Sequence, residues 1–305
     1  MSGTLKANPP EPQHVASGTI ELVISARARD LGGLSVRRLL PSSERRLVGP
    51  FIFFDHMGPA ALPIGAGLDV RPHPHIALAT VTYLFEGEIV HRDSLGSLQA
   101  IRPGDVNWMV AGKGIAHSER SSSEQRARGV RLHGIQSWVA LPLEQEECEP
   151  SFDHHPHRSI PTLARHGVQI DIIGGSLFGS HSPVRVLSPT LYAHARFERG
   201  ARLLLDDEHE ERAVYVVEGT LTIDGQTFHQ GALVILRAAV PAELIAAEAA
   251  RVMLLGGAKL AGERHVFWNF VASTKERIER AKDDWQQGRF PKVVGDELEF
   301  IPLPS

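Results

Sequence analysis

The sequence predicts an all-β fold that ends in one amphipathic helix. From Thr19 to the mid-250s, short apolar runs alternate with Gly, Pro, Asp or Asn at the spacing typical of β-sandwiches and barrels. Helical periodicity is nearly absent over the same range. The chain has 305 residues, which at roughly 150 residues per domain is enough for two domains. We therefore expect two β-domains in tandem.

The two halves share one strand-and-turn pattern. In the first half, the β-branched and aromatic run 80–85 stops at a Glu-Gly turn at 86–87. In the second half, the run 215–217 stops at the same turn at 218–219. The common Tyr-x-x-Glu-Gly sequence indicates duplication of one β-domain. Two unrelated β-domains that share a common turn are the alternative.

The boundary between the domains is expected in the acidic stretch that leads to Pro150. We place the first domain at 1–145 and the second at 146–305, and we assign the C-terminal helix to the second domain.

That helix is predicted over 274–287. Ser273 and Glu276 form a capping box, and Gly288 stands where a C-terminal cap belongs. The apolar face consists of Ile278, Ala281 and Trp285. Docking on a β-domain is its expected role.

Composition excludes several classes of function. With 32 Lys and Arg against 36 Asp and Glu, the net charge is −4, and no dense basic run predicts direct nucleic-acid binding. The single cysteine, Cys148, excludes an internal disulfide framework and fits a reducing compartment. No apolar run is long enough to span a membrane, and the polar residues 1–18 are expected to form a flexible arm. We expect a cytoplasmic monomer.

Histidine is the abundant chemical group, with 16 residues. His73 and His75 are two residues apart at the start of the 80–85 strand region, and His117 and Glu119 repeat that spacing. Because residues i and i+2 share one face of a strand, three imidazoles and one carboxylate can converge. Such a set suits Fe(II), Mn(II), Co(II) or Ni(II) better than zinc, which stays possible. With a divalent ion, the net charge of +1 would favour an anionic oxygen ligand.

The spacing around these residues resembles a known family. Gly67-x5-His73-x-His75-x4-Thr80-x6-Gly87 is similar to the first cupin motif, with Thr80 where many cupins carry a glutamate ligand. The second motif also departs from the general form, because two extra residues separate its glycine from His117. Both departures resemble the pirin family, in which a glutamate two residues after the third histidine replaces the missing ligand. That residue is Glu119.

The resemblance implies two tandem cupin (jelly-roll) barrels, with one metal, usually iron, in the N-terminal barrel. Its ligands would be His73, His75, His117 and Glu119. Bacterial pirins are similar to quercetin 2,3-dioxygenases, so we expect an Fe(II)-dependent oxidoreductase that opens flavonols with O2 and releases CO. Another small aromatic or enolic substrate is possible. Glu119 is also the candidate base for the substrate hydroxyl. Because eukaryotic pirins resemble transcriptional co-regulators, the alternative is a redox-responsive regulator that binds a protein partner.

Four further residues are candidates for the surroundings of the metal. Asp55 and His56 end an apolar run, where they would either orient a ligand or form a solvated turn. Trp108 and Met109 precede the second ligand pair, where they would line the substrate cavity or pack in the core.

The remaining histidines are expected to have structural roles. His91 and His133 are interpreted as exposed or hydrogen-bonded structural residues. The cluster His154, His155 and His157 is interpreted as an ordered crossing segment, with a surface metal site as the alternative. The second domain offers only His209 where paired ligands would stand, so we expect no second metal.

Overall fold

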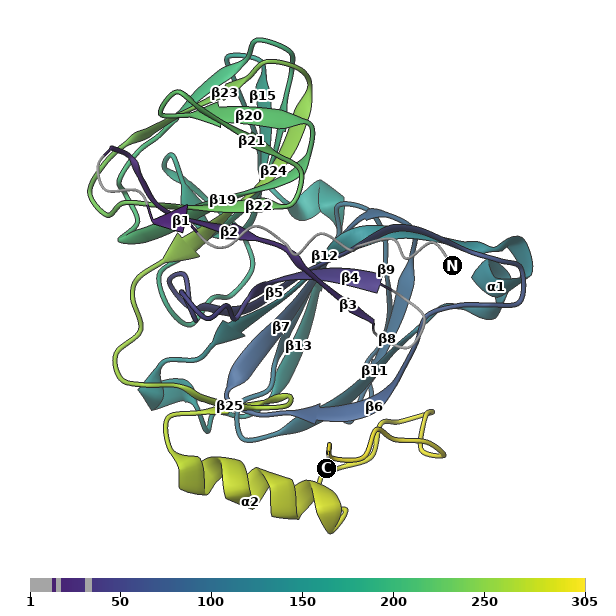
Figure 1. Cartoon of the computed structure of the whole chain (residues 1–305). Helices are drawn as coiled ribbons and strands as arrows, with labels where there is room; N and C mark the ends of the chain where they lie inside the picture. The colour runs from purple at the N-terminus through teal and green to yellow at the C-terminus, as the bar shows by residue number, and fades with distance from the viewer. Residues whose placement is uncertain (1–12, 15–17, 31–34, 305) are drawn as a thin grey trace, which may run out of the picture.

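The computed structural model describes residues 13–14, 18–30 and 35–304. Most of the arm expected over 1–18 lies outside this part of the chain. The described residues form two β-barrels, which Figure 1 shows one above the other, with the helix at the lower end. The prediction of an all-β fold with two tandem barrels and a C-terminal helix is confirmed. In the part of the chain described, no helix combines the length and apolar character of a membrane span.

Two antiparallel sheets build the N-terminal barrel. The larger consists, in spatial order, of β13 (Ser151–His155), β10 (Val106–Val110), β7 (Leu78–Glu86), β12 (Val130–Ala140), β5 (Phe51–Leu62), β4 (Ser35–Leu40) and β3 (Arg27–Asp30). The smaller consists of β6 (Asp69–His75), β11 (Ile115–Arg120), β8 (Ile89–Asp93) and β9 (Leu98–Ile101). A short helix, α1 (Ser123–Arg128), connects β11 to β12.

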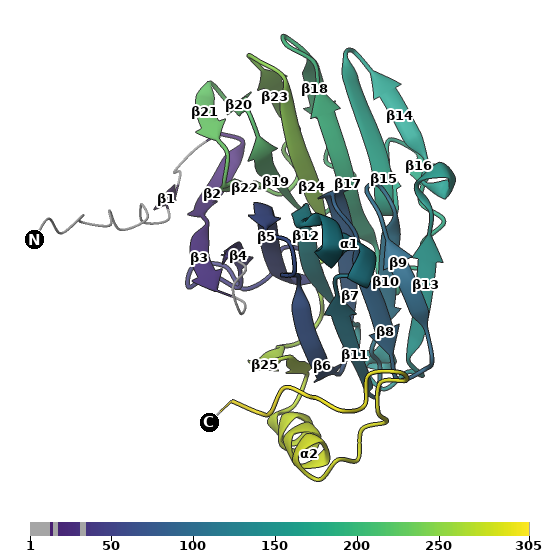
Figure 2. The same ribbon diagram turned by 90° about the vertical axis from the view of Figure 1, so that its right-hand side faces the viewer.

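The C-terminal barrel has the same construction. Its larger sheet consists of β1 (Gln13–His14), β2 (Ile20–Ser25), β22 (Ala232–Leu236), β19 (Glu211–Glu218), β24 (Ala250–Gly257), β17 (Thr190–Phe197), β15 (Val168–Leu177) and β14 (Thr162–Arg165), with β16 (Ser180–His181) beside β15. Its smaller sheet consists of β18 (Arg202–Leu205), β23 (Ala242–Ala246), β20 (Thr220–Ile223) and β21 (Gln226–His229). In Figure 2 the C-terminal barrel is above and the N-terminal barrel is below.

Strand pairing crosses the boundary expected at residue 145 in both directions. β2, from the start of the chain, pairs with β22 of the C-terminal barrel. β13, which follows the short 3-10 helix Leu143–Gln145, pairs with β10 of the N-terminal barrel. The histidine cluster lies on this ordered segment, where the Nδ1 of His154 is 2.8 Å from the side-chain oxygen of Asn107. The division into 1–145 and 146–305 stays a prediction.

The C-terminal helix packs on the N-terminal barrel, although its position in the sequence assigned it to the C-terminal domain. α2 (Lys275–Gln286) and the hairpin β25 (His265–Phe267) and β26 (Phe270–Ala272) pack beneath the N-terminal barrel (Figure 1). A bridge between Phe270 and Ile76, the residue after β6, joins the hairpin to the N-terminal barrel.

The cap of this helix also differs from the prediction. Thr274, not Ser273, caps α2 by accepting from the Arg277 N–H. The physical reason is a tertiary contact, because the hydroxyl of Ser273 donates to the buried carboxylate of Glu146 at 2.7 Å.

The faces of the larger sheets pack on each other to form a core shared by both barrels. Phe51 lies 5.0 Å from Tyr192, and Phe54 lies 5.3 Å from Tyr215, between ring centroids. Trp108 belongs to this core and packs against Gly174, where an added Cβ would lie 3.1 Å from the indole. The barrels are therefore held together by apolar burial.

Candidate metal centre

The smaller sheet of the N-terminal barrel places the predicted ligands. His73 and His75 lie at the end of β6, and His117 lies on the adjacent strand β11. The register pairs His117 with His73, and a bulge separates that pair from the pairing of Glu119 with Val70. Because side chains alternate along a strand, all four predicted groups face the barrel interior.

Three imidazoles converge. Ligand nitrogens of His73, His75 and His117 all lie within 4.8 Å of one another, and they form the one such cluster found among the residues described. The Nε2 atoms of His75 and His117 are 3.1 Å apart. Each of the three side chains is buried. Three close nitrogen donors without a counter-charge among them have the chemistry of a site for a divalent transition metal.

Burial keeps these imidazoles neutral. It lowers the pKa of His73 to about 4 and holds the pKa values of His75 and His117 well below the ordinary value for histidine. A neutral imidazole has a lone pair for a metal, whereas a protonated one has none. The site is thus ready to bind a metal at neutral pH.

Backbone carbonyls orient the two histidines of β6. The Nδ1–H of His73 donates to the carbonyl of Arg71 at 2.8 Å. The Nδ1–H of His75 donates to the carbonyl of Asn269 at 3.1 Å. Both bonds leave Nε2 as the free nitrogen, which is the tautomer that ligates a metal through Nε2.

A second imidazole orients His117. The Nδ1 atoms of His117 and His91 are 3.3 Å apart, and the Nε2 of His91 lies 3.0 Å from the Asp93 carboxylate. When the Nε2–H of His91 donates to the Asp93 carboxylate, the Nδ1 of His91 accepts the Nδ1–H of His117, which leaves the Nε2 of His117 free. His91 is therefore buried and hydrogen-bonded, one of the two alternatives expected. Its contact with a ligand was missed, although the i, i+2 spacing of His91 and Asp93 on one strand is a usable signal.

Glu119 lines the same cavity as the three histidines. Its carboxylate accepts from the Thr82 hydroxyl at 3.1 Å, and Thr82 also contacts the Gln136 side-chain oxygen at 2.9 Å. Burial raises the pKa of Glu119. Its roles as ligand and as base stay predictions.

A cavity of about 400 Å³ opens in front of the histidines. One wall is aromatic, because Phe53 and Trp138 stack with their ring centroids 4.1 Å apart. Four lining residues come from the C-terminal segment: Val266, Trp268, Asn269 and Ile301. Sequence reasoning missed all four, since it assigned this segment to the second domain.

Asp55 and His56 are buried on β5, which excludes the solvated turn. Asp55 lines the cavity and accepts two bonds from the Arg38 guanidinium, each 2.9 Å long. His56 faces the other barrel, with its Nδ1 2.6 Å from the Tyr215 hydroxyl and its Nε2 2.7 Å from the Nε2 of His133. Adjacent strand residues face opposite ways, so only Asp55 reaches the cavity.

Trp108 and Met109 do not line the cavity, contrary to one of the two expectations. The indole of Trp108 is part of the core between the barrels, and Met109 packs with Ala111 and Ile115. The reason is the position of β10 in the larger sheet, between β7 and β13 rather than beside the ligand strands.

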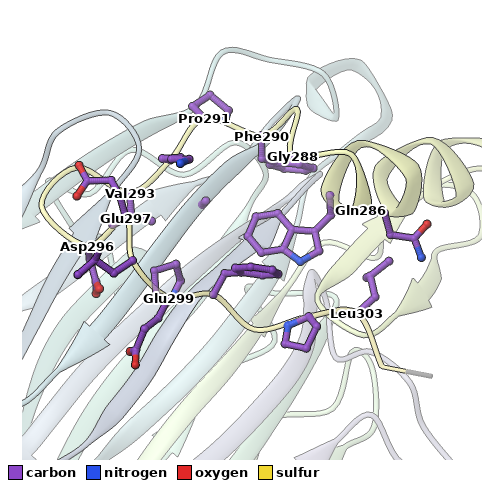
Figure 3. A pocket seen from close by; sticks show the side chains of 16 residues that line it. Gln286, Gly288, Phe290, Pro291, Val293, Asp296, Glu297, Glu299 and Leu303 are labelled. Carbon is purple, nitrogen blue, oxygen red and sulfur yellow. The ribbon is translucent and has the colours of Figure 1, made fainter.

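A second hollow, of about 500 Å³, lies on the outer side of the ligand strands. Figure 3 shows it between α2 and the C-terminal strap, by which we mean residues 288–303, with Phe290 and Leu303 among its walls. Pro72 and Ala116 form its floor. Since these residues alternate with His73 and His117 along their strands, the hollow is separated from the metal cavity by the sheet itself.

Comparison with known proteins agrees with this geometry. The family model described as Pirin matches residues 33–139, and the one described as Pirin C-terminal cupin domain matches residues 192–291. A pirin-like protein of Caulobacter vibrioides is 48% identical over 289 residues, which cover 94% of this chain and 100% of that protein. This chain belongs to the pirin family.

Relatives of this pirin include proteins named for flavonol cleavage. A Pseudomonas aeruginosa protein named as a candidate quercetin 2,3-dioxygenase is 41% identical, over 92% of this chain and 90% of its own length. The crystal structure of quercetin 2,3-dioxygenase from Acinetobacter baumannii matches with a TM-score of 0.88 at 31% identity, over 94% of this chain and 95% of that one. The family and the two cupin barrels expected from the sequence are confirmed.

An Escherichia coli pirin solved in complex with nickel(II) has the same fold, with a TM-score of 0.62 at 20% identity, over 78% of this chain and 99% of that one.

The C-terminal barrel of this pirin has an apolar interior. Leu205, Leu221 and Leu244 are fully buried in its core. His209 contacts the backbone carbonyl of Ser176 at 2.9 Å. The absence of a second metal stays a prediction.

Proposed function

We propose that this pirin is a metal-dependent dioxygenase that cleaves flavonols such as quercetin at the 2,3 position with O2 and releases CO. The observation that carries the proposal is a buried group of three neutral histidines at the back of an aromatic-walled cavity of about 400 Å³. A cavity of that size and lining suits a small planar aromatic molecule. The names of the Pseudomonas and Acinetobacter relatives support the same reaction.

His73, His75 and His117 would hold the metal, with Glu119 as a fourth ligand. Fe(II) is the proposed ion, and Mn(II), Co(II), Ni(II) and Zn(II) are the alternatives. When bound, the ion would supply a Lewis-acidic centre for an enolate oxygen and for O2.

The protein residues would bind the substrate and move its proton. The stacked pair Phe53 and Trp138 offers a flat apolar surface to the flavonol rings. Glu119 would accept the proton of the 3-hydroxyl, because its burial and raised pKa make it a stronger base than an ordinary carboxylate. Thr82 would steady the carboxylate through its hydroxyl. A carboxylate that is bound to a metal is a poor base, so Glu119 would accept this proton only when it is not a metal ligand.

The test is metal analysis of the purified protein, followed by aerobic assay of the protein loaded with Fe, Mn, Co or Ni. We expect loss of flavonol absorbance and one CO per flavonol consumed. His75→Ala should abolish turnover with the fold retained, whereas His155→Ala, a matched change outside the cavity, should not. Unchanged flavonol absorbance with every metal would overturn the proposal.

A further inference from the structure

The C-terminal segment completes a wall of the metal cavity. Trp268 lies in the turn of the hairpin β25–β26, and Ile301 lies on the C-terminal strap. Both side chains line the cavity beside the barrel residues and are half-buried. The barrel alone would leave the cavity open on this side.

The backbone at Trp268 is unusual for so large a residue. Phe267 pairs with Phe270, which leaves Trp268 and Asn269 as a two-residue turn. Trp268 has a φ of 52°, in the left-handed region. Turns of this kind favour Gly, Asn or Asp, and a bulky side chain there is strained. Strained residues of this kind cluster at functional sites, so the indole itself is the feature to be explained.

Helix α2 supports both wall residues. The ring of Trp268 lies 5.7 Å from that of Phe270 and 6.4 Å from that of Trp285. The indole N–H of Trp285 donates to the carbonyl of Ile301 at 3.0 Å. The N–H of Ile301 donates to the carbonyl of Pro72 at 2.8 Å. The wall is thus held between the helix and the ligand strand β6.

The same turn contacts a ligand. The carbonyl of Asn269 accepts from His75, so the residue that presents the indole is covalently next to one that orients the metal site. A substrate held against Trp268 would therefore lie close to the metal.

We propose that Trp268 and Ile301 determine which substrates the cavity accepts. Trp268 packs on the aryl ring that a flavonol carries at C2, and Ile301 limits how far that ring extends. The substrate class is thereby narrowed to planar enols that carry one aryl ring of limited size. This inference rests on the proposed function, and it assigns the selection of substrate to the C-terminal segment.

The test compares two substrates on the iron-loaded protein. 3-Hydroxyflavone carries the aryl ring, and 3-hydroxychromone lacks it. Trp268→Asn removes the indole while keeping a residue that tolerates the turn. We expect its KM for 3-hydroxyflavone to rise about tenfold, because the variant loses an aromatic contact and the apolar area that this contact buries. Its kcat should change less than about threefold. The KM for 3-hydroxychromone should change less than about twofold. Trp268→Phe keeps an aromatic ring, so its KM for 3-hydroxyflavone should stay close to that of the wild type.

The strap provides an independent pair of variants. Ile301→Trp should raise the KM for 3-hydroxyflavone more than that for 3-hydroxychromone, and Ile301→Ala should admit a naphthyl analogue that the wild type rejects. Leu298→Ala is the matched control, because this strap residue is 99% exposed and does not line the cavity. Trp268→Asn could also lower metal binding, because the neighbouring Asn269 carbonyl orients His75. In that case the Ile301 variants decide whether this wall selects the substrate.

Anaerobic calorimetry of 3-hydroxyflavone binding separates the two proposals. Binding that depends on Trp268 without any aerobic turnover would support the wall and overturn the dioxygenase. If the Trp268 and Ile301 variants turn over normally and keep the wild-type ratio of KM for 3-hydroxyflavone to KM for 3-hydroxychromone, only the proposal about these two wall residues is overturned. A wild type that neither binds nor converts the flavonol would overturn both.

Discussion

Single residues show what a period-two pattern can and cannot predict. The spacing of His73 and His75 predicted that both lie on one face of a strand, because the direction of a side chain on a strand is local. That His117 joins them depends on the pairing of β11 with β6 and was implied by the family resemblance. The support of His117 by His91 was not predicted, since it depends on β8 lying beside β11. The expectation that Trp108 and Met109 line the cavity was not met for the same reason. Their strand was recognised from the sequence, but its place in the sheet was not.

The contact between His91 and His117 predicts an effect on metal affinity. His91→Phe removes the nitrogen that accepts from His117, while the new ring can keep the stacked contact with Phe152, now 4.3 Å between centroids. Loss of such an orienting partner lowers metal affinity by about 10 to 100-fold. Chelator competition measures this change, and the exposed His181→Phe is the control. Equal affinity in the variant and the wild type would show that His91 does not orient the ligand.

Elements show the limit of local signals. The range of the C-terminal helix was predicted to within one residue at each end, because capping and amphipathic spacing are local. Its cap and its location were not predicted. Only Ser273 has a glutamate three residues later, but Glu146 binds the Ser273 hydroxyl, and Thr274 caps the helix instead. No local signal shows that a segment after the second barrel returns to the first.

The anchor of that segment gives the next prediction. The Arg264 guanidinium and the Glu146 carboxylate are both buried, with 3.1 Å between Nε and Oε1. Glu146→Ala would leave the Arg264 charge buried without its partner, and we expect a loss of about 3 kcal/mol in the free energy of unfolding. Urea unfolding measures it, with the exposed Glu198→Ala as the control.

Metal affinity should fall in the same variant, because the segment also carries the Asn269 carbonyl that orients His75. Full stability in Glu146→Ala would mean that the segment is held by its apolar contacts alone.

At the scale of the whole molecule, the barrels share polar as well as apolar contacts. Although burial raises the pKa of Asp171, hydrogen bonds from His194, Arg196 and Thr162 outweigh it and hold that pKa below its ordinary value. Tyr83, from the N-terminal barrel, lies 3.0 Å from the Nδ1 of His194 through its hydroxyl. Two barrels were predictable from the repeated turn. The polar cluster at the junction, formed by Tyr83, Thr162, Asp171, His194 and Arg196, was not predictable, because its members are far apart in sequence.

The cluster predicts how stability depends on pH. Burial lowers the pKa of His194 to about 4, against attraction to Asp171 and with added repulsion from Arg196 and Arg251. In the unfolded chain His194 takes up a proton near pH 6.5, whereas in the folded protein it does so only near pH 4. The unfolded state therefore binds more protons in this window, and stability falls as the pH drops through it.

Because burial also lowers the pKa values of His56, His73 and His117, the test is a difference between variants. His194→Gln cannot take up the proton, so its stability should fall less steeply than that of the wild type, by about 1.4 kcal/mol per pH unit between pH 6 and 4.5. Urea unfolding of metal-free protein at several pH values measures both slopes, and the exposed His181→Gln should follow the wild type. Parallel slopes for His194→Gln and the wild type would mean that His194 is protonated alike in both states. The junction of the barrels would then tolerate a charge that its burial beside Arg196 and Arg251 should exclude.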